Sequence, residues 1–167
     1  MAGSDFVFNI ARGALKYYYY AVENSVVLAT SGQFTSTANA ALVLVPIETT
    51  GIEGDDTLNN YDDLAALLAA ANTEQTNQAR KVLTETDLAA VPAPDDTNNR
   101  LDLDLPDVTY TAYGGNAVGK FLLCFRPDTG SADSAIIPLC AYAATLTPDG
   151  VNDVILQPDA AGFWRSA

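Results

Sequence analysis

The chain has 167 residues, with 21 acidic side chains against 8 basic ones and a net charge of −13. This acidic excess argues against binding to nucleic acid or to an anionic membrane, because both require clustered lysine and arginine. The sequence contains no histidine, the commonest general base and metal ligand, so we expect no enzymatic activity and no cofactor. The apolar fraction of 49% predicts one domain, residues 1–167, with a sizeable core.

The first part of the chain predicts short strands separated by polar turns. Residues 6–10, 25–29 and 40–47 are rich in β-branched and aromatic side chains, which favour strands. The third of these stretches ends at Pro46, because proline cannot donate to a strand ladder.

Four consecutive tyrosines lie within residues 14–22. Interpreted as a strand, this stretch places two tyrosines on each face, so one pair enters the core and the other pair is exposed. Exposed tyrosines favour an interface, although a strand with merely solvated phenol groups is the alternative. An aromatic pair near the end of the chain indicates a docked terminus. The predicted interface residues are Tyr17, Tyr18, Tyr19, Tyr20, Phe163 and Trp164.

One helix is predicted over residues 60–72. Asn60 is the candidate N-terminal cap, and two aspartates follow in the first turn, where the helix dipole favours acids. Asn72 is the candidate C-terminal stop. Apolar residues recur with helical spacing at Leu64, Leu67, Leu68 and Ala71. A stripe of this kind indicates packing against a sheet.

The second half of the chain is β-rich. Strands are predicted over residues 80–86, 101–105, 108–113 and 152–157. In residues 101–105 leucine and aspartate alternate, so the leucines face inward while Asp102 and Asp104 face outward. These two carboxylates would need further ligands from elsewhere to hold a cation, and a solvated strand face that blocks edge pairing is the preferred interpretation.

Two apolar runs, residues 121–125 and 135–142, flank a turn-rich insert and predict a central hairpin. A turn centred near residue 132 would place Cys124 opposite Cys140. Two cysteines are too few for a disulfide scaffold, so we expect both to be buried thiols near each other on paired strands.

The fold class that follows is mainly β, with about eight to ten strands and one short α-helix at about residues 60–72. Hairpin-sized gaps favour a single-domain antiparallel β-sandwich or barrel-like sheet. The start of the chain lacks the basic and apolar segments of a signal peptide, and no apolar run spans a bilayer. We therefore expect the chain to fold in a reducing cytosol.

Several stretches together resemble a family of small structural proteins of tailed bacteriophages. They include a Phe-Arg-Pro-Asp-Thr segment and lie at residues 8–13, 61–74, 79–83, 107–115, 119–129, 136–139, 147–150 and 160–165. These are packing and turn motifs that cover nearly the whole chain, and no catalytic or binding residue is carried over with them. The resemblance implies a place in the phage particle.

The resemblance and the acidic charge together predict a capsid decoration (cement) protein that adds contact area to the head lattice. Its partners would be the major capsid protein or other virion proteins, and further copies of the chain in a homo-oligomer. A tail or baseplate adaptor is the alternative within this class. A carbohydrate-binding β-sandwich is the alternative from another class, since exposed aromatic and acidic side chains also suit sugars.

Overall fold

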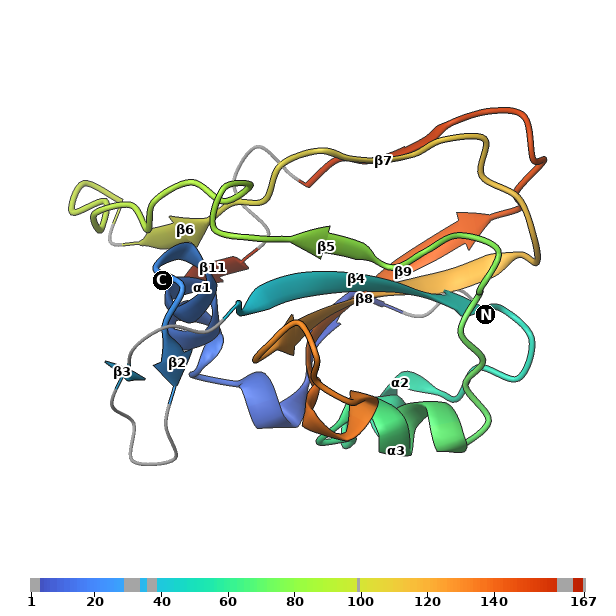
Figure 1. Ribbon diagram of the computed structural model, residues 1–167, viewed down its shortest axis with the longest axis horizontal. Helices are drawn as coiled ribbons and strands as arrows, with labels where there is room; N and C mark the ends of the chain where they lie inside the picture. The colour runs from blue at the N-terminus through green and yellow to red at the C-terminus, as the bar shows by residue number, and fades with distance from the viewer. Residues whose placement is uncertain (1–3, 29–33, 36–38, 99, 159–163, 167) are drawn as a thin grey trace.

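The computed structural model describes residues 4–28, 34–35, 39–98, 100–158 and 164–166 (Figure 1). The helical elements of these ranges are η1 (Asn9–Ala11), α1 (Leu15–Glu23), α2 (Asp55–Leu58), α3 (Leu64–Ala69) and η2 (Asp133–Ala135). The long strands are β4 (Ala41–Glu48), β8 (Val118–Arg126) and β9 (Ile137–Leu146). The short strands are β1 (Phe6–Val7), β2 (Val27–Leu28), β3 (Phe34–Thr35), β5 (Lys81–Leu83), β6 (Leu101–Leu103), β7 (Val108–Tyr110), β10 (Val154–Leu156) and β11 (Trp164–Ser166).

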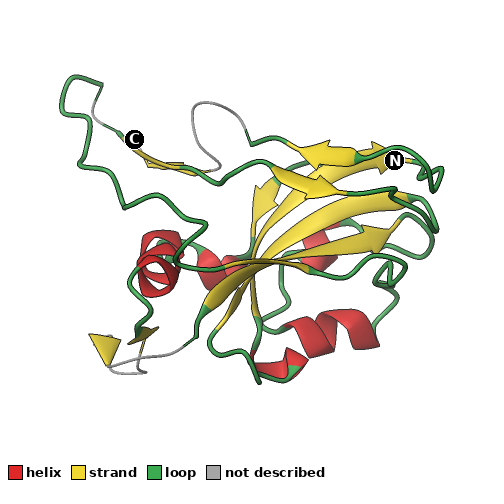
Figure 2. Cartoon of the chain, turned by 45° about the horizontal axis from the view of Figure 1, so that its top comes forward, coloured by secondary structure: helices red, strands yellow, loops and turns green. Residues whose placement is uncertain are grey.

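An antiparallel five-stranded sheet with the order β1-β9-β8-β4-β5 forms the centre of the protein. Three two-stranded ribbons, β10-β7, β11-β6 and β2-β3, accompany it. Figure 2 shows the long strands of the sheet with the helices packed around them. The mainly β, antiparallel prediction is confirmed, but the sheet has two edge strands, β1 and β5, and is not a closed barrel.

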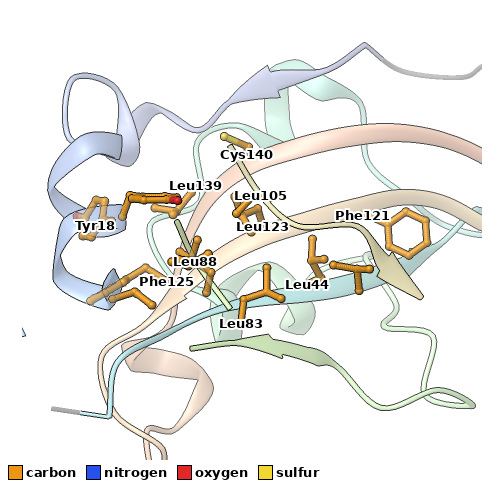
Figure 3. Close-up of a cluster of buried hydrophobic side chains, with 14 of the residues drawn as sticks. Tyr18, Leu44, Leu83, Leu88, Leu105, Phe121, Leu123, Phe125, Leu139 and Cys140 are labelled. Atoms are coloured by element: carbon orange, nitrogen blue, oxygen red, sulfur yellow. The ribbon is translucent and has the colours of Figure 1, made fainter. Parts of the chain in front are cut away.

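The main sheet is covered on both faces, which explains its long uncharged runs. Phe121, Leu123 and Phe125 of β8 belong to one core cluster, and Figure 3 shows them together with Tyr18 of α1. The same cluster also receives side chains from β6 and β7. The intervening Leu122 and Cys124 belong to a second cluster, with α2 and α3. In Figure 1 the β7/β10 ribbon lies on one side of the sheet, and α2 and α3 lie on the other.

The strand predicted for residues 14–22 is wrong, because this stretch forms helix α1. Its buried residues include Leu15, Tyr18, Tyr19 and Val22. They follow the i, i+3, i+4, i+7 spacing of one helix face. The Tyr19 hydroxyl lies 2.9 Å from the Ala89 carbonyl oxygen and 3.0 Å from that of Asp104, both of which can accept its proton.

The helix predicted over residues 60–72 is shorter and begins later. Asp63 is the N-terminal cap of α3, and its carboxylate accepts a hydrogen bond from the Ala66 amide at 2.8 Å. Asn60 instead donates its side-chain amide to the Asp56 carbonyl at the end of α2. Asn72 does help to end the helix, because its buried side chain donates to the Leu67 carbonyl at 3.1 Å. Because α1 and α2 are also helices, the prediction of a single helix is wrong.

The central hairpin is confirmed, but its register differs from the prediction. Leu123 faces Cys140, and after an irregularity Cys124 faces Pro138. This irregularity displaces the pairing, and a displacement of one residue turns a side chain to the opposite face of a sheet. Cys124 and Cys140 therefore belong to different core clusters on opposite faces, so the predicted pairing of the two thiols is wrong.

Candidate functional site

The exposed side of α1 gathers two tyrosines and two cations. The side chains of Tyr17 and Tyr20 are 52% and 38% exposed, and they share one side of the helix because they are three residues apart. Lys16 on the same helix and Arg12 just before it are also exposed. Gly13, with φ of 78°, makes the turn from η1 into α1, which a residue without a side chain adopts most readily. We call these four residues, Arg12, Lys16, Tyr17 and Tyr20, the α1 face.

The cations of the α1 face differ from most cations elsewhere in the described part of the chain. Others are engaged internally: Arg80 with Glu74 and Asp133, Arg100 with Asp95 and Asp102, Lys120 with Asp55, and Lys81 over the Tyr110 ring. Arg12 and Lys16 form no ion pair with any described residue.

These two cations also lie at the N-terminal end of α1, where the first turn has no acidic residue. The helix dipole disfavours positive charge there by about 0.3–1 kcal/mol for each charge. Arg12 and Lys16 therefore do not stabilise the helix through its dipole, and their charges are available to an acidic surface outside the molecule.

The other predicted interface residues have different places. Tyr18 and Tyr19 lie in the core, at 9% and 1% exposure. Trp164 belongs to β11, whose backbone pairs with that of β6 in a register that sets Trp164 opposite Leu103 in the ladder. The predicted docking of the terminus is therefore confirmed for residues 164–166, while Phe163 lies outside the described residues.

The aspartates of residues 101–105 are placed as predicted, opposite the inward-facing leucines. Asp102 forms an ion pair with Arg100 at 3.0 Å. The Asp104 carboxylate accepts a hydrogen bond from the Leu105 amide at 2.8 Å. Within the ranges that the structure describes, no three His, Cys, Asp or Glu side chains are grouped closely enough to hold a metal ion.

The two thiols are placed where they are poor nucleophiles. Cys124 and Cys140 are both buried and free. Burial raises the pKa of the Cys124 thiol far above its usual range, and it raises the pKa of Cys140 to about 12. Both remain protonated at neutral pH, and the thiol form reacts slowly with electrophiles and metals.

Both thiols are therefore expected to be inaccessible to an aromatic disulfide reagent in the native protein. Full denaturation should release two reactive thiols per chain, because the cysteines lie on opposite sheet faces and cannot form a disulfide with each other. Absorbance titration with and without denaturant measures this count. A native count above zero, or a denatured count of zero, would contradict this placement.

Lys120 is a polar site that the sequence interpretation missed. It is only 2% exposed within β8. Its Nζ lies 3.0 Å from Asp55 Oδ1, donates to the Ser4 carbonyl at 3.1 Å, and is 5.2 Å from the centre of the Phe6 ring. The other Asp55 oxygen accepts hydrogen bonds from the Ser4 amide at 2.7 Å and the Ser4 hydroxyl at 3.1 Å. The only sequence signal was a single charge inside an apolar run.

No helix in the described ranges is long and apolar enough to cross a membrane. Comparisons of the chain with protein-family models, with curated proteins and with solved structures found no match.

Proposed function

We propose that this protein is a non-enzymatic structural protein of a tailed-phage particle, most specifically a capsid decoration (cement) subunit on the head. The observation that carries the proposal is the α1 face, which exposes two tyrosines beside two cations that pair with no described residue. The sequence resemblance to small phage structural proteins supports the same proposal.

A cement protein acts through contact area that symmetry repeats over the lattice. Tyrosine suits such contacts, because it gives a large area at low entropy cost and keeps a hydroxyl for hydrogen bonding. Arg12 and Lys16 add attraction to an acidic surface. The major capsid protein, another virion protein or a neighbouring copy of this chain would supply that surface.

The alternative as a tail or baseplate adaptor uses the same contacts at a different place in the particle. Cryo-electron microscopy of intact particles separates the two, because density for this chain would lie on the head lattice or on the tail. The carbohydrate-binding alternative places a sugar on the tyrosines instead, and a glycan array tests it directly.

The double substitution Tyr17→Ser and Tyr20→Ser is expected to weaken attachment to particles that lack the protein. A loss of about 1 kcal/mol for each tyrosine, or about 30-fold in total, follows from removing aromatic contacts at an interface. The melting temperature should change little, since neither side chain belongs to the buried core. Co-sedimentation with depleted particles measures the attachment, and calorimetry measures the melting temperature.

A matched control is available in Val82→Ser with Ile155→Ser. These residues are 38% and 54% exposed, so their replacement removes exposed apolar surface outside the α1 face. The control should bind depleted particles like the natural protein. Equal loss of binding in both double variants would mean that general surface hydrophobicity, and not the α1 face, drives attachment.

A further inference from the structure

A mainly apolar cavity of about 400 Å³ lies between the main sheet and the segments that carry β7 and β10. Asp5 and Gln157 contribute polar groups to its lining. A concave, mostly apolar site with a small number of polar groups is the usual form of a site for a small molecule. The apolar walls include Leu44, Phe121 and Ala144 from the main sheet, and Leu105, Val108 and Leu156 from the opposite side.

The residues on the two sides explain why space remains here. Tyr110 of β7 is fully buried, and its ring lies 5.8 Å from that of Phe121, so a large side chain fills the space between the layers beside the cavity. The short side chain of Ala144 leaves the space open. Pro106 and Pro158 also line the cavity, just outside the paired residues of β7 and β10. Their fixed φ angles stiffen these two segments, so the cavity is preformed.

The charged group in the described lining is a carboxylate. Asp5 is exposed and forms no ion pair with any described cation. Its Oδ1 accepts the Ala143 amide hydrogen at 2.7 Å, which holds the carboxylate at the rim of the cavity. Burial is the main reason that the pKa of the Tyr142 hydroxyl is raised, and the negative charge of Asp5 adds to this effect. The charge of Asp5 therefore acts on the wall of the cavity.

A second carboxylate lies beside the cavity. Asp107 stands between Pro106 and Val108, which both line the cavity, and its Oδ2 accepts a hydrogen bond from the lining side chain of Gln157 at 3.0 Å. Asp107 is exposed and is likewise unpaired with any described cation. No lysine or arginine is among the lining residues that the structure describes. This arrangement complements a positive charge attached to an apolar body.

We propose that this cavity binds a small organic amine, in which a primary ammonium group is carried on an aromatic or alkyl body. The body fills the cavity, and the ammonium group lies at the rim, where Asp5 and Asp107 attract it. Aromatic walls such as Phe121 and Tyr142 also favour a cation. Because both carboxylates face solvent, burial of the apolar body supplies most of the affinity and charge supplies the selectivity. The site is separate from the α1 face and requires no virion component.

The test titrates three molecules of similar size into the full-length protein with isotope-labelled methyl groups. They are 2-phenylethylamine, 2-phenylethanol and phenylacetate, which share the aromatic body and are positive, neutral and negative at neutral pH. NMR should show saturable shifts of the methyl signals of Leu105, Val108 and Leu156 with the amine at low salt. The amine should bind about threefold more tightly than the alcohol, because an exposed ion pair adds only modest affinity. Phenylacetate should bind more weakly than both.

Two matched variants test the role of Asp5. Asp5→Asn removes the charge but keeps an oxygen that can accept the Ala143 amide hydrogen. It should bind the amine about twofold to threefold more weakly, while its affinity for the alcohol is unchanged. Asp153→Asn removes the same charge from a carboxylate that also accepts a backbone amide hydrogen, that of Ala112 at 2.8 Å, but that does not line the cavity. This control should keep the natural preference for the amine.

A second pair of variants tests occupancy of the cavity itself. Ala144→Leu places a larger side chain in the cavity and should abolish the saturable shifts with both the amine and the alcohol. Ala144→Ser changes the volume little and should bind the amine within about twofold of the natural protein. Spectra without added ligand report whether each variant is folded, and the comparison of Asp5→Asn with Asp153→Asn does not depend on either.

The proposal is overturned if millimolar amine leaves these methyl signals unshifted, or if phenylacetate binds as tightly as the amine. Equal affinity for the amine and the alcohol would also overturn it, and would indicate an apolar cavity without selection for charge. An equal loss of amine binding in Asp5→Asn and Asp153→Asn would show that the general acidity of the chain, and not the rim of the cavity, attracts the amine.

Discussion

Lys120→Ala is expected to lower the free energy of unfolding by about 3 kcal/mol. Removing one partner of a buried ion pair costs about 3–5 kcal/mol, because the remaining charge is left uncompensated. Lys120 has a side-chain exposure of 3%, whereas Asp55 is 28% exposed and can regain some hydration. The lower end of the range therefore applies, and urea denaturation measures the difference.

Two variants control this measurement. Lys120→Met keeps most of the side-chain volume and removes the charge, so it isolates the ion pair from the loss of packing. Lys16→Ala removes an exposed cation that has no ion-pair partner among the described residues, and should change stability by less than about 0.5 kcal/mol. Similar values for Lys120→Ala and Lys16→Ala would show that Lys120 is not buried as the structure places it.

The same ion pair makes stability depend on pH. Burial opposes ionisation of Asp55, but hydrogen bonds from Ser4 and the charge of Lys120 outweigh it, so the pKa of Asp55 is lowered. Because the Asp55 carboxyl ionises more readily in the folded protein, its charge stabilises the fold at pH values above the unfolded-state pKa of about 3.9. This stabilisation is lost as the pH falls through the pKa of the folded state. The stability difference between the natural protein and Lys120→Met should shrink below about pH 4.

The hairpin of β8 and β9 could be predicted because its signal is local: two apolar runs and a turn-rich insert. Its register could not, since the irregularity between Leu123 and Cys124 leaves no mark in composition. A single displaced residue moved Cys124 to the face opposite Cys140. Strand existence follows from local pattern, while register follows from packing across the sheet.

The error at α1 has a different cause. Four tyrosines favour a strand when they are considered alone. The buried residues of α1, however, extend from Leu15 to Val22. Over this longer stretch, the spacing of the apolar residues is that of a helix. The expectation that two tyrosines are buried and two exposed remains correct. The exposed pair is different from either predicted pair. A helix places Tyr17 and Tyr20 on one side, whereas a strand would have placed alternate residues together.

The candidate sites depend on contacts between distant parts of the chain. The ammonium group of Lys120 donates a hydrogen bond to Ser4 and forms an ion pair with Asp55. Both partners are far from Lys120 in sequence. Arg80 likewise pairs with Asp133 of η2, which is far from it in sequence. Neither arrangement follows from a local pattern, whereas the outward aspartates of residues 101–105 did, because alternation alone determines their face.

Arg80→Ala is expected to destabilise the fold by about 2–3 kcal/mol, because Arg80 joins two acidic groups from separate segments. Its guanidinium donates to Glu74 at 2.7 and 2.6 Å and to Asp133 at 2.6 and 3.0 Å. These bonds connect the segment before β5 to η2. The exposures of Arg80, Glu74 and Asp133 are 24%, 16% and 37%, so solvent reduces the cost below that of a fully buried pair.

Arg80→Lys keeps the charge but loses the planar, two-pronged geometry that fits both carboxylates, so its stability should lie between those of the natural protein and Arg80→Ala. The hydrogen bonds from Arg80 are the main reason that the pKa of Asp133 is lowered. The stabilisation is therefore present above about pH 4 and is lost as pH falls through the folded pKa. Urea denaturation at neutral pH and at about pH 3 measures both effects. An Arg80→Ala penalty that is the same at both values would contradict the ion-pair explanation and leave only lost packing of the arginine stem.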